Sequence, residues 1–291
     1  MDTDDLGVLT EKVPIGKWVA NAVDFIKDQL FHELRAFSEA IGWLLDACAD
    51  FLGLIPPLLF VALVAGLGYW LHRSIALVIG IVIGLLIILN IGYWEEMLFT
   101  VVLVLASTVV CMLVGVPIGI AAAHRPWLYR ALRPILDLMQ TVPPFVYLIP
   151  TLSFFGLGLV PGLIATVIFV IPAPIRLTHL GISSAPRPLL EAGRAFGASD
   201  LQLLLKVELP HAMPNIMQGI TQSIMLSLSM VVIAALVGAP GFGVPVVRAL
   251  ATANVAQGFE AGLAIVIVAI VLDRIVKQSG RRKGRRGTAA R

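Results

Sequence analysis

The sequence predicts an all-α polytopic membrane protein, and three observations support this fold class. First, 58% of its 291 residues are hydrophobic and only 13% are charged, which is unusual for a soluble chain of this size. Second, several apolar stretches approach the ~20 residues that a helix needs to cross a bilayer. Third, one long segment, residues 186–210, interrupts those stretches with charged side chains.

The apolar stretches predict about seven transmembrane helices. We expect them at residues 55–71, 75–93, 98–122, 135–155, 157–175, 216–237 and 261–276. The first two are separated only by His72, Arg73 and Ser74, so they predict a tight transmembrane hairpin within residues 51–93. The remaining spans form a core over residues 94–278.

The N-terminal extension, residues 1–50, is acidic, and residues 15–45 show helical periodicity. This pattern predicts an amphipathic helix that lies at the membrane surface or packs on the bundle. The first residues are acidic where a signal peptide has a basic region, so we expect no cleavable signal. A short basic tail covers residues 279–291.

Basic residues between the spans concentrate on one side of the predicted membrane. They are Arg73, Arg125, Arg130, Arg133, Arg176, Arg187, Arg194, Lys206 and Arg274. That side is cytoplasmic by the positive-inside rule. The rule therefore predicts an N-terminus outside, a cytoplasmic C-terminus and a cytoplasmic position for residues 186–210.

The segment 186–210 reads PRPLLEAGRAFGASDLQLLLKVELP and is too charged to cross a bilayer. Five charged residues follow Pro188 in this segment. At ~3 kcal/mol each near mid-bilayer, they would together oppose insertion by about 15 kcal/mol. They are Glu191, Arg194, Asp200, Lys206 and Glu208. The segment therefore lies outside the lipid.

Within this segment the pattern predicts two short helices joined at a glycine. Pro188 suits a first helical position, and Gly197 can end the first helix in the left-handed conformation. Ser199 and Gln202 have the spacing of a capping box that starts the second helix. We expect Pro210 to end that helix.

The same residues carry a resemblance. The run Glu191-Ala192-Gly193, then Gly197, then Val207-Glu208-Leu209-Pro210 resembles the EAA loop of ABC-importer permeases. The spacing matches throughout, with Gly193 in place of a second alanine and Val207 in place of isoleucine. The resemblance implies a coupling helix that inserts into a groove on a separate ATPase subunit. The coupling residues would be Glu191, Ala192, Gly193, Gly197, Leu209 and Pro210, while an ordinary cytoplasmic hairpin is the alternative.

A wider resemblance, to the quaternary-amine group of these permeases, rests on residues 136–150, 191–199, 227–243 and 258–274. It implies a type I ABC-importer permease fold and import of glycine betaine, proline betaine or choline. The implied partners are a cytoplasmic ATP-binding subunit, a periplasmic or lipid-anchored substrate-binding protein, and a second copy of the chain in a homodimer. The departure is Ala239-Pro240, where a more glycine-rich run is expected.

Polar residues inside the predicted spans suggest a translocation path. Asp137, Gln140 and Thr141 could line it, because intramembrane ionisable residues often do. The alternative is a local pair between Asp137 and Arg133 at the headgroup level. Ser227 and Ser229 could line the path or hold helices together.

Residues 238–245, GAPGFGVP, follow the sixth predicted span. A plain re-entrant turn at the outer face is one interpretation. An outer gate that contacts a partner delivering substrate is the other, with Gly238, Gly241 and Gly243 as its residues.

No recognisable motif for catalysis, cofactor binding or metal binding is present. The five histidines are scattered without ligand spacing, and there is no Walker A, HExxH or GxSxG sequence. We therefore expect no enzyme activity, no cofactor and no metal, and an ATPase on another subunit. The basic residues cluster by membrane side, so nucleic acid is not an expected partner. A self-sufficient secondary transporter or channel for a small solute is the alternative function; it would lead us to expect repeats.

Overall fold

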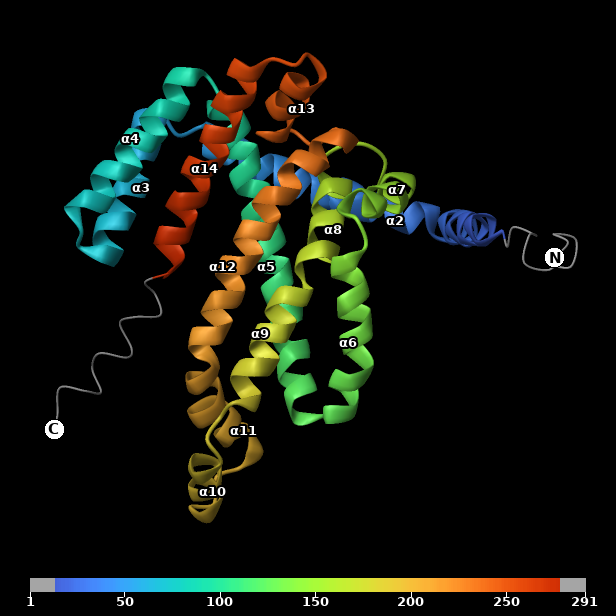
Figure 1. Cartoon of the computed structure of the whole chain (residues 1–291), viewed down its shortest axis with the longest axis vertical. Helices are drawn as coiled ribbons and strands as arrows, with labels where there is room; N and C mark the ends of the chain where they lie inside the picture. The colour runs from blue at the N-terminus through green and yellow to red at the C-terminus, as the bar shows by residue number, and fades with distance from the viewer. Residues whose placement is uncertain (1–13, 278–291) are drawn as a thin grey trace, which may run out of the picture.

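The computed structural model describes residues 14–277, and every regular element in that range is a helix (Figure 1). The most acidic part of the N-terminal extension, residues 1–13, and the predicted basic tail, residues 279–291, lie outside the described residues. The predicted all-α fold class is confirmed.

Three long helical elements form the centre of the molecule. They are α5 (Trp94–His124), α8 (Leu159–Val170) continued by α9 (Pro172–Ser183), and α12 (Leu209–Ala234). Figure 1 shows α5, α9 and α12 running side by side. We call the end that carries α10 (Arg187–Ala195) and α11 (Asp200–Leu203) the lower end, and the end that carries α13 (Gly243–Ala251) the upper end.

Small residues allow these helices to approach closely. A Cβ atom on Gly119 of α5 would lie 2.7 Å from the Cβ of Thr178 on α9. A Cβ atom on Gly181 of α9 would lie 2.9 Å from that of Ala212 on α12. Helices in lipid associate through such close backbone contacts, so these glycines fix the spacing of the central helices.

Within residues 14–277, four helical stretches are long and apolar enough to cross a membrane. They are Trp94–His124, Leu159–Ser183, Asp200–Val237 and Val255–Lys277, the last being α14. They correspond to the predicted spans at 98–122, 157–175, 216–237 and 261–276. The total of seven stays a prediction, because bent pairs of helices allow up to six spans and α4 is shorter.

The predicted hairpin is formed by α3 (Pro57–His72) and α4 (Ile75–Ile91). Arg73 turns the chain between them with a left-handed backbone (φ +50°). The hairpin stands to one side of the centre, beside α14 (Figure 1). Gly84 of α4 comes close to Ile267 of α14, where an added Cβ would be 2.7 Å from the isoleucine Cγ2.

The span predicted at residues 135–155 is broken in the structure, and its crossing of the membrane as one span stays a prediction. Two helices, α6 (Pro126–Thr141) and α7 (Pro144–Phe155), meet there at 95°. Val142 is extended (ψ 129°), because a residue that precedes proline is disfavoured in the helical region, and Pro143 is extended as well (ψ 133°). Because of this bend, only α6 runs along the bundle. The helix α6 also starts nine residues before the predicted start of the span.

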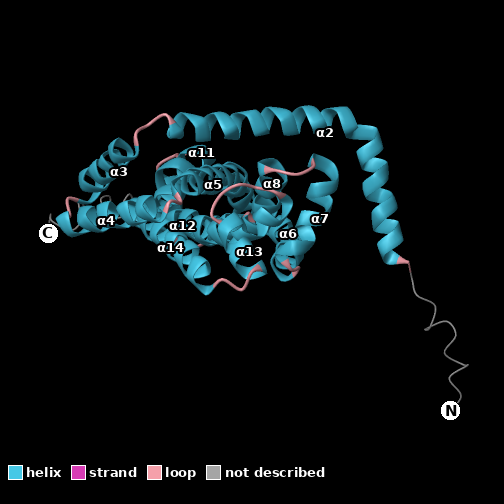
Figure 2. Ribbon diagram, turned by 90° about the horizontal axis from the view of Figure 1, so that it is seen from above, coloured by secondary structure: helices cyan, strands magenta, loops and turns pink. Residues whose placement is uncertain are grey.

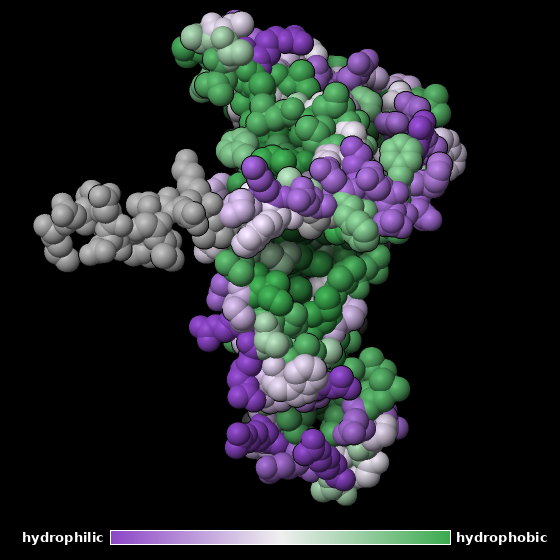
Figure 3. Space-filling view, turned by 90° about the vertical axis from the view of Figure 1, so that its right-hand side faces the viewer, coloured by the Kyte–Doolittle hydropathy of each residue, from purple (hydrophilic) through white to green (hydrophobic). Residues whose placement is uncertain are grey.

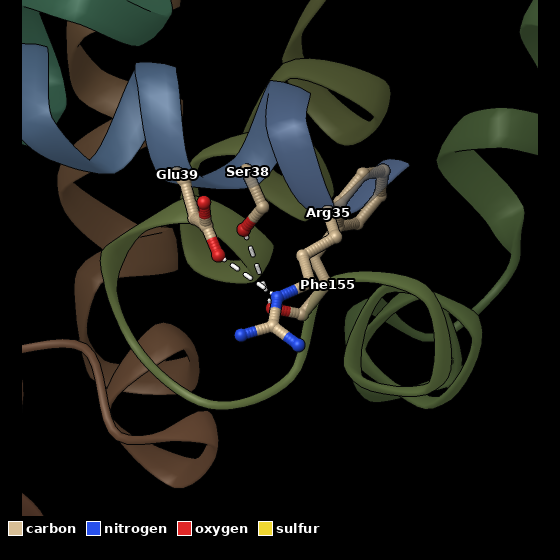
Figure 4. Close-up of polar contacts among 4 residues, drawn as sticks. All are labelled: Arg35, Ser38, Glu39 and Phe155. Carbon is tan, nitrogen blue, oxygen red and sulfur yellow. Dashed lines mark hydrogen bonds and ion pairs between the residues drawn. The ribbon is translucent and has the colours of Figure 1, made fainter. Parts of the chain in front are cut away.

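The predicted amphipathic helix is α2 (Ile15–Gly53), which bends where Leu30 leaves the helical conformation (Figure 2). Beyond the bend, α2 lies across α5, α7 and α8, with Leu45 and Ala49 buried. Figure 4 shows the Ser38 Oγ donating to the Phe155 carbonyl oxygen at 3.4 Å, beside an Arg35–Glu39 ion pair. Of the two alternatives for this helix, packing on the bundle therefore describes its second half.

Candidate functional site

The segment 186–210 has the predicted helix–glycine–helix arrangement. Gly197 adopts a left-handed backbone (φ +74°) after α10. The Ala198 N–H donates to the Gly193 carbonyl at 3.0 Å, and the Gly197 N–H donates to the Arg194 carbonyl at 2.9 Å. These bonds satisfy the last carbonyls of α10, so glycine ends the helix as expected.

The predicted capping box is also present at the start of α11. The Gln202 N–H donates to the Ser199 Oγ at 3.3 Å. The Ser199 N–H in turn donates to the Gln202 Oε1 at 2.9 Å. The two residues therefore satisfy each other's free donors and fix the angle at which the second helix leaves the glycine.

The prediction that Pro210 ends the second helix is wrong. The chain stays helical from α11 through a π-turn, η2 (Leu204–Glu208), into α12. The Leu209 N–H donates to the Leu204 carbonyl, five residues back. Pro210 stands in the first turn of α12 and has no N–H to contribute, so a widened turn just before it lets the helix continue.

Gly193, one of the two positions at which the sequence departs from the EAA pattern, lies where α10 and α11 approach each other. An added Cβ there would lie 2.5 Å from the Cδ2 of Leu203, which is buried. A larger residue at 193 would require the leucine to move. Glycine therefore suits the close packing of the two short helices.

The outer surface of this segment is exposed and partly apolar. No residue of α10 is buried, and the Phe196 side chain is 92% exposed. We call the exposed apolar residues the apolar tip: Leu189, Phe196, Leu201 and Leu205. At the lower end, hydrophobic side chains lie beside hydrophilic ones on the surface (Figure 3). Such an exposed apolar patch is typical of a surface that docks onto another protein.

The base of the segment is joined to α5. His124, the last residue of α5, places its Nε2 2.8 Å from the Oε2 of Glu208 in the π-turn. Glu208 is buried, whereas His124 is about half exposed. The sequence does not predict this pair, because the two residues are 84 positions apart and the EAA pattern does not specify either of them.

Asp137 pairs with Arg176 of α9 rather than with Arg133. The Arg176 Nη2 donates to the Asp137 Oδ1 at 2.7 Å. Arg176 lies within the helical stretch 159–183, which continues past the predicted span at 157–175, and its cytoplasmic side stays a prediction. Asp137 is 54% exposed and Arg176 is 33% exposed. A charged pair therefore joins two helices that otherwise make few contacts.

The other candidate path residues differ in their surroundings. Gln140 is half-buried and Thr141 is exposed, with its Oγ1 donating to the Leu138 carbonyl at 3.2 Å. Ser229 is exposed on α12. Ser227 is buried and accepts a hydrogen bond from the Ser107 Oγ of α5 at 2.9 Å, which joins the two helices.

The glycine loop at the upper end is packed into the bundle. Gly238 and Gly241 have left-handed backbones (φ +81° and +122°), and Gly243 begins α13. The Phe242 N–H donates to the Thr100 Oγ1 of α5 at 2.9 Å, and the Phe242 ring is fully buried. Gly241 and Gly243 are buried as well, so only Gly238 of the three candidate gate glycines is exposed.

Within residues 14–277 no group of three or more metal-binding side chains comes together. The features that stand out in the described part of the chain are the exposed segment 186–210, its buried base and the charged pair between α6 and α9.

Comparison with known proteins agrees with this arrangement. Residues 115–285 match the family described as the binding-protein-dependent transport system inner membrane component. The chain belongs to this family. It is a multi-pass inner-membrane protein and the permease subunit of an ABC importer, which confirms the resemblance found in the sequence.

Similar proteins with established roles cover nearly the whole chain. The glycine betaine transport system permease protein OpuAB of Bacillus subtilis is 46% identical over 279 residues, covering 96% of this chain and 98% of its own. The glycine betaine/proline betaine transport system permease protein ProW of Escherichia coli is 38% identical, covering 94% of this chain and 77% of its own.

A solved structure supports the fold. The inward-facing MetNI methionine ABC transporter has a chain that aligns with a TM-score of 0.56 and 22% identity, covering 69% of this protein and 96% of that chain. At this identity the likeness speaks for the type I permease fold alone.

Proposed function

We propose that this chain forms the pore of an ATP-driven importer for a quaternary amine, namely glycine betaine, proline betaine or choline. The observation that carries the proposal is the exposed two-helix segment, which continues without a break into a central helix through Asp200–Val237. The substrate class is supported by OpuAB and ProW, whose names specify glycine betaine and, for ProW, also proline betaine.

The coupling role belongs to the segment 186–210. Its apolar tip would insert into a groove of a cytoplasmic ATP-binding subunit, with Glu191 and Ala192 exposed beside it. Gly193 and Gly197 would set the shape of the segment. Leu209 and Pro210 would pass its movement into α12, because the helix is continuous there.

The energy and the selectivity would come from partners. The sequence has no Walker A motif, so ATP hydrolysis belongs to the cytoplasmic subunit. A periplasmic or lipid-anchored binding protein would select the solute, because a cage of aromatic rings suits a quaternary ammonium ion. Two copies of the chain would enclose the pore, each with its N-terminus outside and its C-terminus in the cytoplasm.

The translocation path would pass the pair of Asp137 and Arg176. Both side chains belong to helices of the bundle and both are partly exposed, and charged residues inside a membrane usually face a water-filled path or a protein interior. Gln140, Thr141 and Ser229 would add polar groups, whereas the buried Ser227 would serve mainly to hold helices together. The loop of Gly238, Gly241 and Gly243 would close the upper end.

The first experiment is purification of the tagged chain from its own membranes in mild detergent, followed by mass spectrometry. We expect a stoichiometric P-loop ATPase to co-purify. The purified complex and its binding protein, reconstituted in liposomes, should then import radiolabelled glycine betaine or choline only with ATP. A homo-oligomer that imports solute without any ATPase would instead establish a secondary transporter.

The path is tested by Asp137→Asn in the same liposomes. We expect slower uptake at unchanged expression, because Arg176 loses its charged partner. Glu39→Gln is the matched control, since it removes the acid of the exposed Arg35–Glu39 pair on α2. Equal uptake by Asp137→Asn and Glu39→Gln would remove Asp137 from the path.

A further inference from the structure

The contact between His124 and Glu208 joins two parts of the molecule that the coupling role requires to move together. His124 ends α5, directly before the turn into α6. Glu208 ends the π-turn at the base of the coupling segment. The 2.8 Å bond between Nε2 and Oε2 is therefore a direct side-chain link from the coupling segment to the α5–α6 hairpin.

The geometry at the imidazole determines where the hydrogen atoms lie. The His124 Nδ1 is 3.0 Å from the Ile120 carbonyl oxygen, and a carbonyl only accepts, so Nδ1 carries a hydrogen. Nε2 then either donates a second hydrogen to a Glu208 carboxylate or accepts one from the protonated acid. In both states one hydrogen lies between the two side chains, and the pair has no net charge.

The surroundings make this bond costly to break. The Glu208 side chain is only 11% exposed. An apolar cluster beside the pair joins α5, α9, η2 and α12; it contains Ile120, Ala123, Ile182, Leu204, Leu209 and Ala212. A buried carboxyl group that loses its partner is strongly destabilised, so the π-turn and the end of α5 are expected to move as one unit.

The second helix of the α5–α6 hairpin, α6, carries Asp137, which pairs with Arg176 of α9. Leu136 is the one buried residue of α6, so this helix has little packing of its own. An ion pair and a ring stack connect it to α9: Asp137 with Arg176, and Tyr129 on His179 with ring centroids 3.6 Å apart. A displacement at the start of α6 would therefore act first on these contacts.

We propose that His124 and Glu208 are positioning residues, which carry the movement of the coupling segment through the α5–α6 hairpin to the contacts between α6 and α9. The proposal rests on the coupling role proposed above. It adds a second route of transmission beside the continuous helix into α12. This route runs through side chains that the EAA pattern does not specify.

The test measures the ATP hydrolysed for each glycine betaine molecule imported by the reconstituted complex. Glu208→Ala should raise this ratio about tenfold, as expected for the loss of one charge-assisted hydrogen bond. Glu208→Gln should keep the ratio within about twofold of the wild type, because its amide N–H can donate to Nε2 of the neutral imidazole. Rescue by glutamine and failure of alanine together support the positioning role.

Asp273→Ala is the matched control. Asp273 is as buried as Glu208 and pairs with Lys277 at the same 2.8 Å, but both residues lie on α14. We expect its ratio to stay at the wild-type value. A rise equal to that of Glu208→Ala would show a general effect of losing a buried carboxylate and would overturn the proposal.

Two further measurements keep the test decisive. If Glu208→Ala does not fold, His124→Ala replaces it, since His124 is 46% exposed and its loss leaves less buried space. A ratio unchanged in the folded alanine variant overturns the positioning role while the proposed function stands. A wild type that imports no solute with ATP overturns the proposed function, and the positioning role with it.

Discussion

Glycine turns at the two ends of the molecule serve opposite needs. At the lower end, Gly197 is left-handed (φ +74°), and a Cβ added there would have no atom within 4 Å. At the upper end, a Cβ added to Gly243 would overlap the carbonyl oxygen of Val231 and lie 2.7 Å from the Cβ of Ala235. Gly197 therefore needs backbone freedom, whereas Gly243 needs space.

The region around Gly197 is an exposed surface, whereas the loop around Gly243 is packed into the bundle. Around Gly197 the side chains of the apolar tip point away from the bundle and are available to a partner. Around Gly243 the loop is hydrogen-bonded to Thr100 and covered by neighbouring helices. Substitutions at the lower end should therefore affect assembly and coupling, whereas those at the upper end should affect folding. Four predictions test this division, in order of decreasing effect.

The largest effect is expected for Gly243→Ala. The new methyl group has no room, so we expect a loss of about 3 kcal/mol or more of stability and little folded protein. Fluorescence-detected size-exclusion chromatography of the detergent extract measures it. Gly262→Ala on α14 is the control, because no atom lies within 4 Å of its added Cβ. A normal yield of Gly243→Ala would show that the upper loop is not fixed.

The next effect is expected for Phe196→Asp combined with Leu201→Asp. Two charges on the apolar tip should abolish co-purification of the ATPase, because charges are disfavoured at the core of an interface. The permease itself should keep its chromatographic profile and melting temperature. Leu250→Asp places a charge on an exposed leucine of the upper end and should leave the ATPase bound. Retention of the ATPase by the double variant would contradict the docking role.

An intermediate effect is expected for Gly197→Val. A β-branched residue in the left-handed region is strained by about 1–2 kcal/mol, so the turn should change shape while the spans still insert. We expect ATP hydrolysis without matching uptake in liposomes. Gly197→Asn should retain most of the uptake, since asparagine tolerates this conformation. Normal uptake by Gly197→Val would count against the coupling assignment.

The smallest effect is expected for Thr100→Val. The buried Phe242 N–H loses its acceptor, which should cost about 1–3 kcal/mol and lower the melting temperature without preventing uptake at room temperature. Thr252→Val is the control, because the exposed Thr252 bonds only within its own helix end. Equal melting temperatures for the two variants would show that the Thr100 bond does not hold the loop.

Local chemistry explains what the sequence could predict. The left-handed turn at Gly197 and the capping box of Ser199 and Gln202 depend on residues within a few positions of each other, so the sequence predicts both. The apolar stretches identified the long spans for the same reason, because the ~20-residue rule concerns one helix at a time.

What the sequence could not predict depends on the packing between helices. The partner of Asp137 is 39 residues away, and only the arrangement of α6 against α9 shows that it is Arg176 and not Arg133. Pro210 was expected to end a helix, but the π-turn before it absorbs the missing hydrogen bond. The adjacent Pro143 and Pro144 indicate a break in the helix, but the sequence does not give the size of the bend, which is 95°.

The close packing of α10 on α11 has a consequence for the history of the family. With glycine at position 193, a leucine fits at position 203. An alanine at position 193 would place its Cβ 2.5 Å from the Cδ2 of Leu203. Homologues with the usual second alanine should therefore have a smaller side chain at position 203 or a different rotamer there. The two positions are expected to covary, so an alignment of many relatives would record this contact as a pair of compensating substitutions.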